Sequence, residues 1–322
     1  MMYIPFPRTD LDNDTDLVAW RTKTSYKESD WKKLKDFLAK QPRLFADIHP
    51  LPKCWYSELH QGDNYALDVE HFRPKKSGNP LTAKQKTVIG KRFGLTVEQL
   101  EDKAISPYYH WLKFDYRNYR LVTALTNRTG AKHIYFPVAK NSKRLASGEF
   151  PWYKKEYPLL LDPTNEHDAN LLLVQPNGAI TPRATKTLIL ASDYADLAKN
   201  WHNEGFNYLR ASITIHLYRL NERVFIEGRH KVYQDTTKKI EMLIEAHKSN
   251  NSKFISYFTE ELLHSILPSA QFALAAKCAM QAYVVPSMET HDTIQDTENS
   301  IKAILQAQAQ LINKEVISWK KP

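Results

Sequence analysis

The sequence predicts an α+β protein in which helices predominate, and three observations lead to that fold class. In much of the chain beyond residue 184, apolar residues recur at three- and four-residue steps between charged ones, which is typical of amphipathic helices. Two apolar runs, 171–174 and 179–181, flank the Asn177-Gly178 pair, a strong signal for a β-hairpin. Between 51 and 137, short aromatic runs alternate with turns and with two lysine-rich stretches, a pattern that differs from the helical part of the chain.

The first 50 residues are expected to form an N-terminal helical segment. Residues 1–24 contain many Asp and Pro residues and are expected to be irregular. Ser29-Asp30 offers a helix N-cap, and Pro42 lies near the end of the pattern that follows. The apolar face of that helix would consist of Trp31, Leu34, Phe37 and Leu38.

Two further regions follow this N-terminal segment, which makes three in all. The second region, 51–140, contains the short aromatic runs and is interrupted by a helical insertion at 81–105, with Thr96 as N-cap and Glu98 and Gln99 behind it. The third, 141–322, combines the hairpin with a helical C-terminal part. Helices are expected there at 222–247, 253–266, 269–283 and 300–316.

Composition excludes several classes of protein. The 322 residues are 42% hydrophobic and 25% charged, so the chain can bury a core and is not wholly disordered. Only two cysteines are present, which excludes a disulfide scaffold and suits a reducing, cytoplasmic setting. The N-terminus does not read as a signal peptide. The longest apolar stretch, 270–285, is interrupted by polar residues, so we expect no membrane span.

The charge balance favours a polyanionic partner. Lys and Arg number 45 against 36 Asp and Glu, which gives a net charge of +9 and a pI near 9.2. Fixed cations gain free energy by displacing counterions from phosphates. Because many basic proteins bind no nucleic acid, a merely soluble basic protein stays open at this point. The chain has no Gly-x-x-x-x-Gly-Lys phosphate loop, so it is not expected to bind ATP by that route.

The most informative stretch runs Asp68-Val69-Glu70-His71-Phe72-Arg73-Pro74-Lys75-Lys76. Adjacent side chains of an extended backbone point to opposite sides, so a carboxylate can face a metal while the imidazole beside it faces a water. Taken alone, the stretch could equally be a surface Glu-His pair with solvated lysines. Downstream, Asn118 and Asn127 stand nine residues apart, and Arg128 follows directly.

Together these residues resemble the finger of HNH nucleases, in which Asp/Glu-His is followed by Asn, by His or Asn nine residues later, and by a basic residue. The run EHFRPK, residues 70–75, is similar to the PtuB-like effectors of Septu-type and some retron anti-phage systems. Segments 160–163 and 214–229 resemble that family more weakly. The resemblance implies a ββα-metal finger embedded in a mainly helical scaffold, and a metal-dependent HNH endonuclease that serves as a toxic defence effector.

The resemblance also implies a role for each residue. Glu70 and Asn127 would bind Mg²⁺ or Mn²⁺, which prefer oxygen ligands. His71 would deprotonate the attacking water, and Asn118 would brace the His71 loop by hydrogen bonds. Asp68 would be a second-shell group or a fallback metal ligand. The expected phosphate contacts are Arg73, Lys75, Lys76, Arg128 and Lys132.

One departure from the family concerns zinc. PtuB-like proteins usually carry two Cys-x-x-Cys pairs that bind a structural zinc. Here the first pair would be Cys54 and Ser57, and the second Thr123 and Thr126, so three of the four cysteines are missing. A single thiolate cannot hold a tetrahedral zinc ion. We therefore expect no structural zinc and a substitute packing by aromatic residues, namely Trp55, Tyr56, Tyr108, Tyr109 and Trp111.

The expected partners follow from the same resemblance. They are a DNA substrate and an ABC/SMC-like, PtuA-like ATPase, with or without a retron reverse transcriptase and its nucleic acid. The ATPase is expected to dock on the last helix, around Ile301, Leu305, Leu311, Ile312 and Trp319. Two alternatives stay open: a catalytically inactive HNH-like docking subunit of an ATPase complex, which the missing cysteines favour, and an HNH nuclease that acts on RNA.

Overall fold

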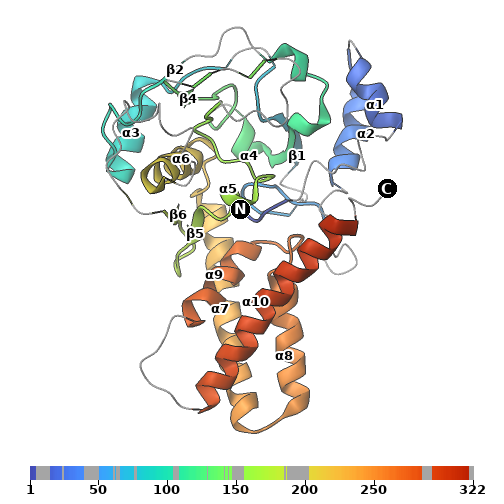
Figure 1. Ribbon diagram of the computed structural model, residues 1–322, viewed down its shortest axis with the longest axis vertical. Coiled ribbons are helices and arrows are strands. Elements are labelled where there is room, and N and C mark those ends of the chain that lie inside the picture. Colours follow the sequence, from blue (N-terminus) through green and yellow to red (C-terminus); the bar gives the residue numbers. More distant parts are fainter. Residues whose placement is uncertain are drawn as a thin grey trace.

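The computed structural model describes residues 1–4, 15–23, 25–39, 51–60, 62, 66–75, 78–103, 109–128, 130–140, 142–143, 145–146, 156–184, 186, 203–284 and 292–318. They form a rounded head, made of the described residues up to 217, above a stalk made of the helices from 223 to 318 (Figure 1). Helices predominate and the sheets are small, so the α+β prediction is confirmed. No helix in the described part of the chain is both long and apolar enough to span a membrane.

Two helices begin the head, α1 (Thr15–Thr22) and α2 (Glu28–Ala39). The first lies in a segment expected to be irregular, so that expectation is wrong for these residues. The second confirms the predicted helix but begins before the predicted cap. The Asp30 carboxylate accepts a hydrogen bond from the backbone N–H of Lys27 at 3.0 Å. Asp30 therefore stabilises the start of the helix from a position inside its first turn.

Three two-stranded antiparallel sheets lie in the head. Strand β1 (Leu67–His71) pairs with β3 (Tyr119–Thr123), and the single-turn helix α4 (Ala124–Asn127) follows β3 directly. Strand β2 (Asp102–Lys103) pairs with β4 (Val138–Ala139). The predicted hairpin is confirmed as β5 (Leu172–Val174) and β6 (Ile180–Pro182), whose turn places Gly178 at a φ of +82°.

The insertion 81–105 contains a helix, but at a different position from the one expected. Helix α3 (Ala83–Phe93) begins with a complete capping box between Thr82 and Gln85, and Gly94 ends it at a φ of +67°. Thr96 and Gln99 form the two reciprocal hydrogen bonds of a capping box, at 2.8 and 3.3 Å. They close only a turn that leads into β2, so the N-cap assigned to Thr96 is wrong.

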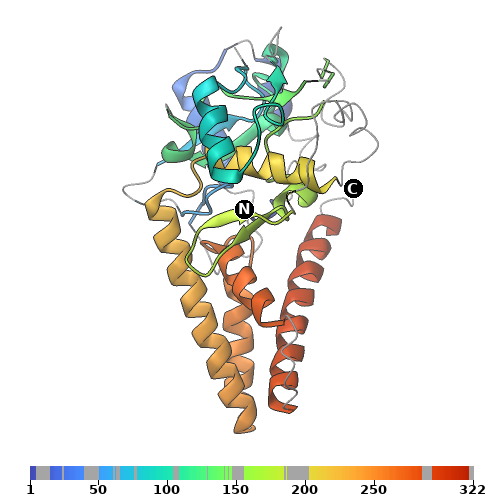
Figure 2. The same ribbon diagram turned by 90° about the vertical axis from the view of Figure 1, so that its left-hand side faces the viewer.

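The C-terminal part is helical, as predicted. Helix α6 (Glu204–Leu217) crosses the base of the head, and α7 (Arg223–Lys248) leads away from it into the stalk (Figure 2). The stalk continues with α8 (Ser252–Ser265), α9 (Ala273–Val284) and α10 (Asp292–Ser318), so the last two begin four residues later and eight residues earlier than expected. The described part of the chain also contains the short helices η2 (His110–Leu112), η3 (Tyr116–Asn118) and α5 (Glu166–Ala169).

The stalk has its own hydrophobic core. It consists of Ile240, Leu243, Leu262, Ile266, Ala276, Met280, Ile301 and Ile304. Ile301 is fully buried there and Leu305 packs against the same cluster, so these two predicted docking residues face the stalk interior. Trp319 lies outside the described residues.

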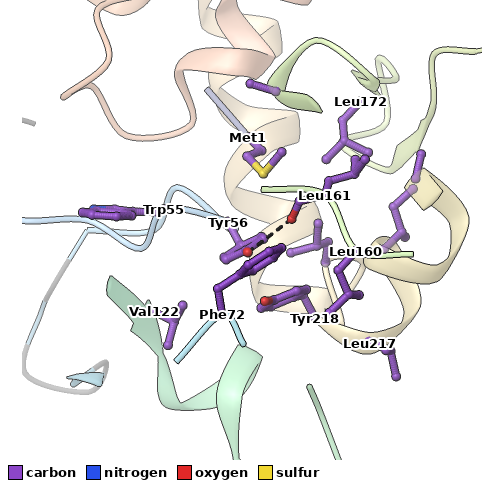
Figure 3. Close-up of a cluster of buried hydrophobic side chains, with 14 of the residues drawn as sticks. Met1, Trp55, Tyr56, Phe72, Val122, Leu160, Leu161, Leu172, Leu217 and Tyr218 are labelled. Carbon is purple, nitrogen blue, oxygen red and sulfur yellow. Dashed lines mark hydrogen bonds between the residues drawn. The ribbon is translucent and has the colours of Figure 1, made fainter. Parts of the chain in front are cut away.

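The core of the head reaches from the strands to α6. Figure 3 shows the stacked rings of Tyr56 and Tyr218 in one cluster with Phe72, Leu160 and Leu161. The rings of Tyr56 and Tyr218 stack with centroids 3.7 Å apart and planes 14° apart, and the Tyr56 hydroxyl donates to the carbonyl oxygen of Leu161 at 3.2 Å. This packing fixes the end of α6 against the loop that follows β1.

Candidate functional site

The candidate site lies where β1 ends, beside β3 and α4. Glu70 pairs with Arg120 and His71 with Tyr119 across the two strands. The two side chains point to opposite sides of the strand, as the alternation predicts. Glu70 is buried, with 3% exposure, whereas His71 is partly exposed.

His71 lies in an aromatic pocket. Its ring meets the edges of Tyr119 and Trp31, with centroids 4.9 and 6.0 Å away. Nε2 lies 2.9 Å from the carbonyl oxygen of Lys113, which can only accept, so Nε2 carries the proton and Nδ1 keeps a free lone pair. Burial, helped by the positive charge of Lys75, lowers the pKa of His71 to about 3. The ring is therefore neutral near pH 7.

The Glu70 carboxylate has an ion-pair partner and a hydrogen-bond donor inside the protein. The Lys132 ammonium forms an ion pair with its carboxylate, and the Tyr218 hydroxyl donates to it at 3.2 and 3.3 Å. Burial raises the pKa of Glu70, while the charges of Lys132 and Arg120 oppose that shift. The predicted metal ligand thus has an internal cation as its neighbour.

Lys132 does not lie on a phosphate-binding surface. Its side chain is 1% exposed, and its ammonium also donates to the carbonyl oxygens of His71 and Phe72 at 2.8 and 3.2 Å. An ammonium has three donors, and three acceptors are present here. The phosphate contact expected for Lys132 is corrected accordingly: in this arrangement the residue is an internal counterion.

Asn118 makes the bracing contacts expected of it. Its amide oxygen accepts from the backbone N–H of Arg73, and its amide nitrogen donates to the Arg73 carbonyl oxygen, both at 2.9 Å. The backbone carbonyl of Asn118 also accepts from Phe72 at 2.8 Å. Because Asn118 is buried, with 1% exposure, these bonds fix the loop immediately after His71.

The other expected phosphate contacts differ in their surroundings. Arg73 forms an ion pair with the buried Glu156 at 2.7 Å, which turns its guanidinium inward. The Lys75 ammonium lies over the Trp31 ring, 5.3 Å from its centroid. Lys76 lies outside the described residues. Arg128 is the most accessible, with 66% of its side chain exposed, and it pairs loosely with Asp68 at 3.3 Å.

The residues around Glu70 do not fit a divalent cation while Lys132 is in place. Among the residues that the structure describes, no group of three or more His, Cys, Asp or Glu side chains is arranged to hold a metal ion. Asn127 ends α4 and is half-buried, and its backbone carbonyl accepts from His133 at 2.9 Å. Asp68, the fallback ligand, forms an ion pair with Arg128.

The four positions of the family's zinc pairs come together in space. Thr126 Oγ1 lies 3.8 Å from Cys54 Sγ and 3.3 Å from Thr123 Oγ1, and it donates to the Thr123 carbonyl at 2.9 Å. The backbone N–H of Ser57 donates to Cys54 Sγ at 3.3 Å. All four residues are buried, so hydrogen bonds join β3 and α4 to the 54–57 turn. Of the aromatic residues expected to help, Tyr108 lies outside the described residues.

Three residues of the site were not predicted from the sequence. Tyr218 follows α6 and reaches Glu70 from 148 positions away in the chain. Lys113 offers His71 its carbonyl oxygen, and Trp31 of α2 forms one wall of the His71 pocket. Only Tyr218 had a signal, because it lies in the 214–229 segment that resembles the PtuB-like family.

The site combines a strand pair and a short helix with a Glu-His pair and a bracing asparagine, and comparison with known proteins supports part of its interpretation. The chain is similar to the Septu protein PtuB of Bacillus mycoides (strain KBAB4), with 28% identity over 193 residues. The match covers 59% of this chain and 50% of that protein, so it spans about half of the relative's length. No family model matches the sequence. No solved structure matches it either.

Proposed function

We propose that this protein is an HNH-type nuclease that hydrolyses phosphodiester bonds as the effector of a bacterial anti-phage system. The observation that carries this proposal is the pair of hydrogen bonds between the Asn118 amide and the backbone of Arg73, because it fixes the loop after His71 and with it the imidazole. The similarity to a Septu PtuB protein supports the same proposal.

His71 is the proposed general base. Its Nε2–H is held by the Lys113 carbonyl, so the lone pair of Nδ1 can accept a proton from a water that attacks phosphorus. In the free protein the pKa of His71 is low, which keeps the ring unprotonated but makes it a weak base. A bound phosphate brings negative charge close to the ring, which raises that pKa toward the working range.

The proposed substrate is DNA. Three cations of the described surface would contact phosphates: Lys75 and Lys113, whose charges act on His71, and the exposed Arg128 beside Asp68. Such contacts read the backbone and not the bases, so the described site would also accept RNA. Mg²⁺ or Mn²⁺ is the proposed cofactor, and Glu70 and Asn127 are the proposed ligands.

An ATPase of the ABC/SMC type is the proposed partner. A free nuclease would damage the cell that makes it, so the ATPase would keep the nuclease inactive until infection. Because Ile301 is buried in the stalk core, the proposed docking surface for the ATPase lies on another side of α10 or elsewhere on the stalk.

A second candidate function is a catalytically inactive docking subunit of such an ATPase complex. The specific observation in its favour is the ion pair between Lys132 and Glu70, which engages the proposed metal ligand within the protein.

A cleavage assay separates the two functions. The purified protein is incubated with supercoiled plasmid, linear DNA and RNA in Mg²⁺, in Mn²⁺ and in EDTA, with and without a PtuA-like ATPase. The nuclease proposal expects cleavage that EDTA stops. Intact nucleic acid under every condition, together with a stable complex with the ATPase, would support the docking subunit instead.

A further inference from the structure

A cavity of about 300 Å³ lies where the head meets the stalk. The head lines it with Tyr3, with Glu166 of α5 and with Arg183, which directly follows β6. The stalk lines it with Lys277 and Gln281 of α9 and with residues of α10. Its volume is at the lower end of the range for small-molecule sites, which is about 300–1,000 Å³.

Lys277 brings a half-buried positive charge to this cavity. Its ammonium forms neither an ion pair nor a hydrogen bond with the residues that the structure describes. Burial lowers the pKa of Lys277 and the nearby charge of Arg183 lowers it further, while the charge of Glu166 opposes the shift. A cation that has lost part of its hydration is unfavourable unless an anion lies beside it.

Two further hydrogen-bond donors line the same cavity. The Arg183 guanidinium is exposed and donates to the side-chain oxygen of Gln281 at 3.2 Å, which leaves most of its N–H groups for a ligand. The Tyr3 hydroxyl has no hydrogen-bond partner within the described part of the chain. Burial and the charge of Glu166 raise the pKa of Tyr3, so the hydroxyl keeps its proton and can donate it to an anion.

The charge of the lining suits a phosphate group. Among the described lining residues, Lys277 and Arg183 carry two positive charges against the single negative charge of Glu166, which forms no ion pair with either of them. A phosphate group carries about −1.5 to −2 charges near pH 7 and has three strong acceptor oxygens. An ammonium, a guanidinium and a hydroxyl supply matching donors, whereas a carboxylate would bring only one charge and two oxygens.

We propose that this cavity binds the phosphate group of a small molecule, either inorganic phosphate or a mononucleotide, between Lys277, Arg183 and Tyr3. Because the head and the stalk both supply donors, the ligand would link α9 to residues 1–4 and to the end of β6. The described lining includes none of the residues around His71, so the site is separate from the proposed nuclease site. Binding here does not depend on that function and can be measured without any cleavage.

The test is a phosphorus NMR titration of the purified protein with inorganic phosphate and, separately, with adenosine monophosphate, in a chloride buffer. The wild type is expected to bind at least one of them. Lys277→Met keeps the apolar stem and removes the ammonium, so affinity should fall about ten-fold or more, because hydrogen bonds to charged groups are the stronger ones. Lys239→Met is the matched control: Lys239 is also half-buried and lines a cavity of about 430 Å³, but it pairs with Glu261 at 2.8 Å. It should leave phosphate affinity unchanged.

Tighter binding of adenosine monophosphate would identify a mononucleotide as the ligand, equal affinities would identify phosphate itself, and both results support the proposal. Three results would overturn it: no binding of either compound to the wild type, wild-type affinity in a folded Lys277→Met protein, or an equal loss in Lys239→Met. If Lys277→Met does not fold, Tyr3→Phe decides the question. It keeps the ring and removes the hydroxyl, so affinity should fall several-fold, and an unchanged affinity would refute the inference.

Discussion

Replacing Asn118 by alanine should lower both the stability of the fold and the rate of cleavage, and comparison with a control variant separates these two effects. The substitution removes two hydrogen bonds to the backbone of Arg73, at 2.9 Å each. A hydrogen bond contributes about 1 kcal/mol net, and a buried group left without a partner costs about 1–3 kcal/mol. Asn118→Ala should therefore lower the free energy of unfolding by about 2–4 kcal/mol.

A matched control exists elsewhere in the chain. Asn221 braces Ile180 in the same way, accepting from its N–H at 2.7 Å and donating to its carbonyl oxygen at 2.8 Å. Asn221→Ala removes the same pair of bonds from the β5–β6 hairpin, so its loss of stability should be similar. Asn221 also accepts a longer bond from Arg229 at 3.3 Å, which adds to the cost of its removal.

Only Asn118→Ala should lose cleavage. A loop displaced by about 1 Å at a catalytic site can lower the rate by roughly 100-fold. Urea unfolding gives the stability of both variants, and plasmid cleavage at a temperature where both are folded gives their activity. An Asn118→Ala protein that cleaves as fast as Asn221→Ala would refute the claim that this brace positions His71.

Two further predictions concern metal and acid. The purified protein should contain no stoichiometric zinc, and EDTA should stop cleavage without lowering the melting temperature; elemental analysis that finds one tightly held zinc per chain would contradict our reading of the Cys54 cluster. Because the pKa of His71 is about 3 in the folded protein and about 6.5 when unfolded, the unfolded state binds more protons between these values, and stability is lost as the pH falls below 6.5. The slope from this group is at most about 1.4 kcal/mol per pH unit, so His71→Gln should show a shallower loss of stability in urea titrations from pH 7 to pH 4, and equal slopes would argue against a lowered His71 pKa in the folded protein.

Much of the helical fold could be predicted because its signals are local. The span of α7 follows from a long amphipathic pattern, and the β5–β6 hairpin from one Asn-Gly turn. The cap at Thr96 was misplaced because Thr82 and Gln85 form a box of the same kind upstream. Both boxes form, but β2 begins at Asp102, so only a turn fits after Thr96, whereas the chain after Thr82 continues as a helix to Phe93.

The candidate site was predictable where its contacts are close in sequence or follow strand alternation. The opposite orientations of Glu70 and His71 follow from the strand, and the role of Asn118 from the spacing of the motif. The burial of Lys132 could not be predicted, since a basic residue near a predicted site is equally compatible with a phosphate contact and with an ion pair. The Tyr218 contact depends on how α6 packs against the head, which no local pattern reports.

The central claim is that His71 removes a proton from the attacking water, and His71→Ala tests it most directly. The matched control is His110→Ala, because His110 is an exposed histidine in the same part of the head. Cleavage of plasmid DNA in Mg²⁺ is measured beside a melting curve for the wild type and for both variants. The account predicts that His71→Ala folds but does not cleave, while His110→Ala cleaves like the wild type. Full cleavage by a folded His71→Ala protein would contradict it.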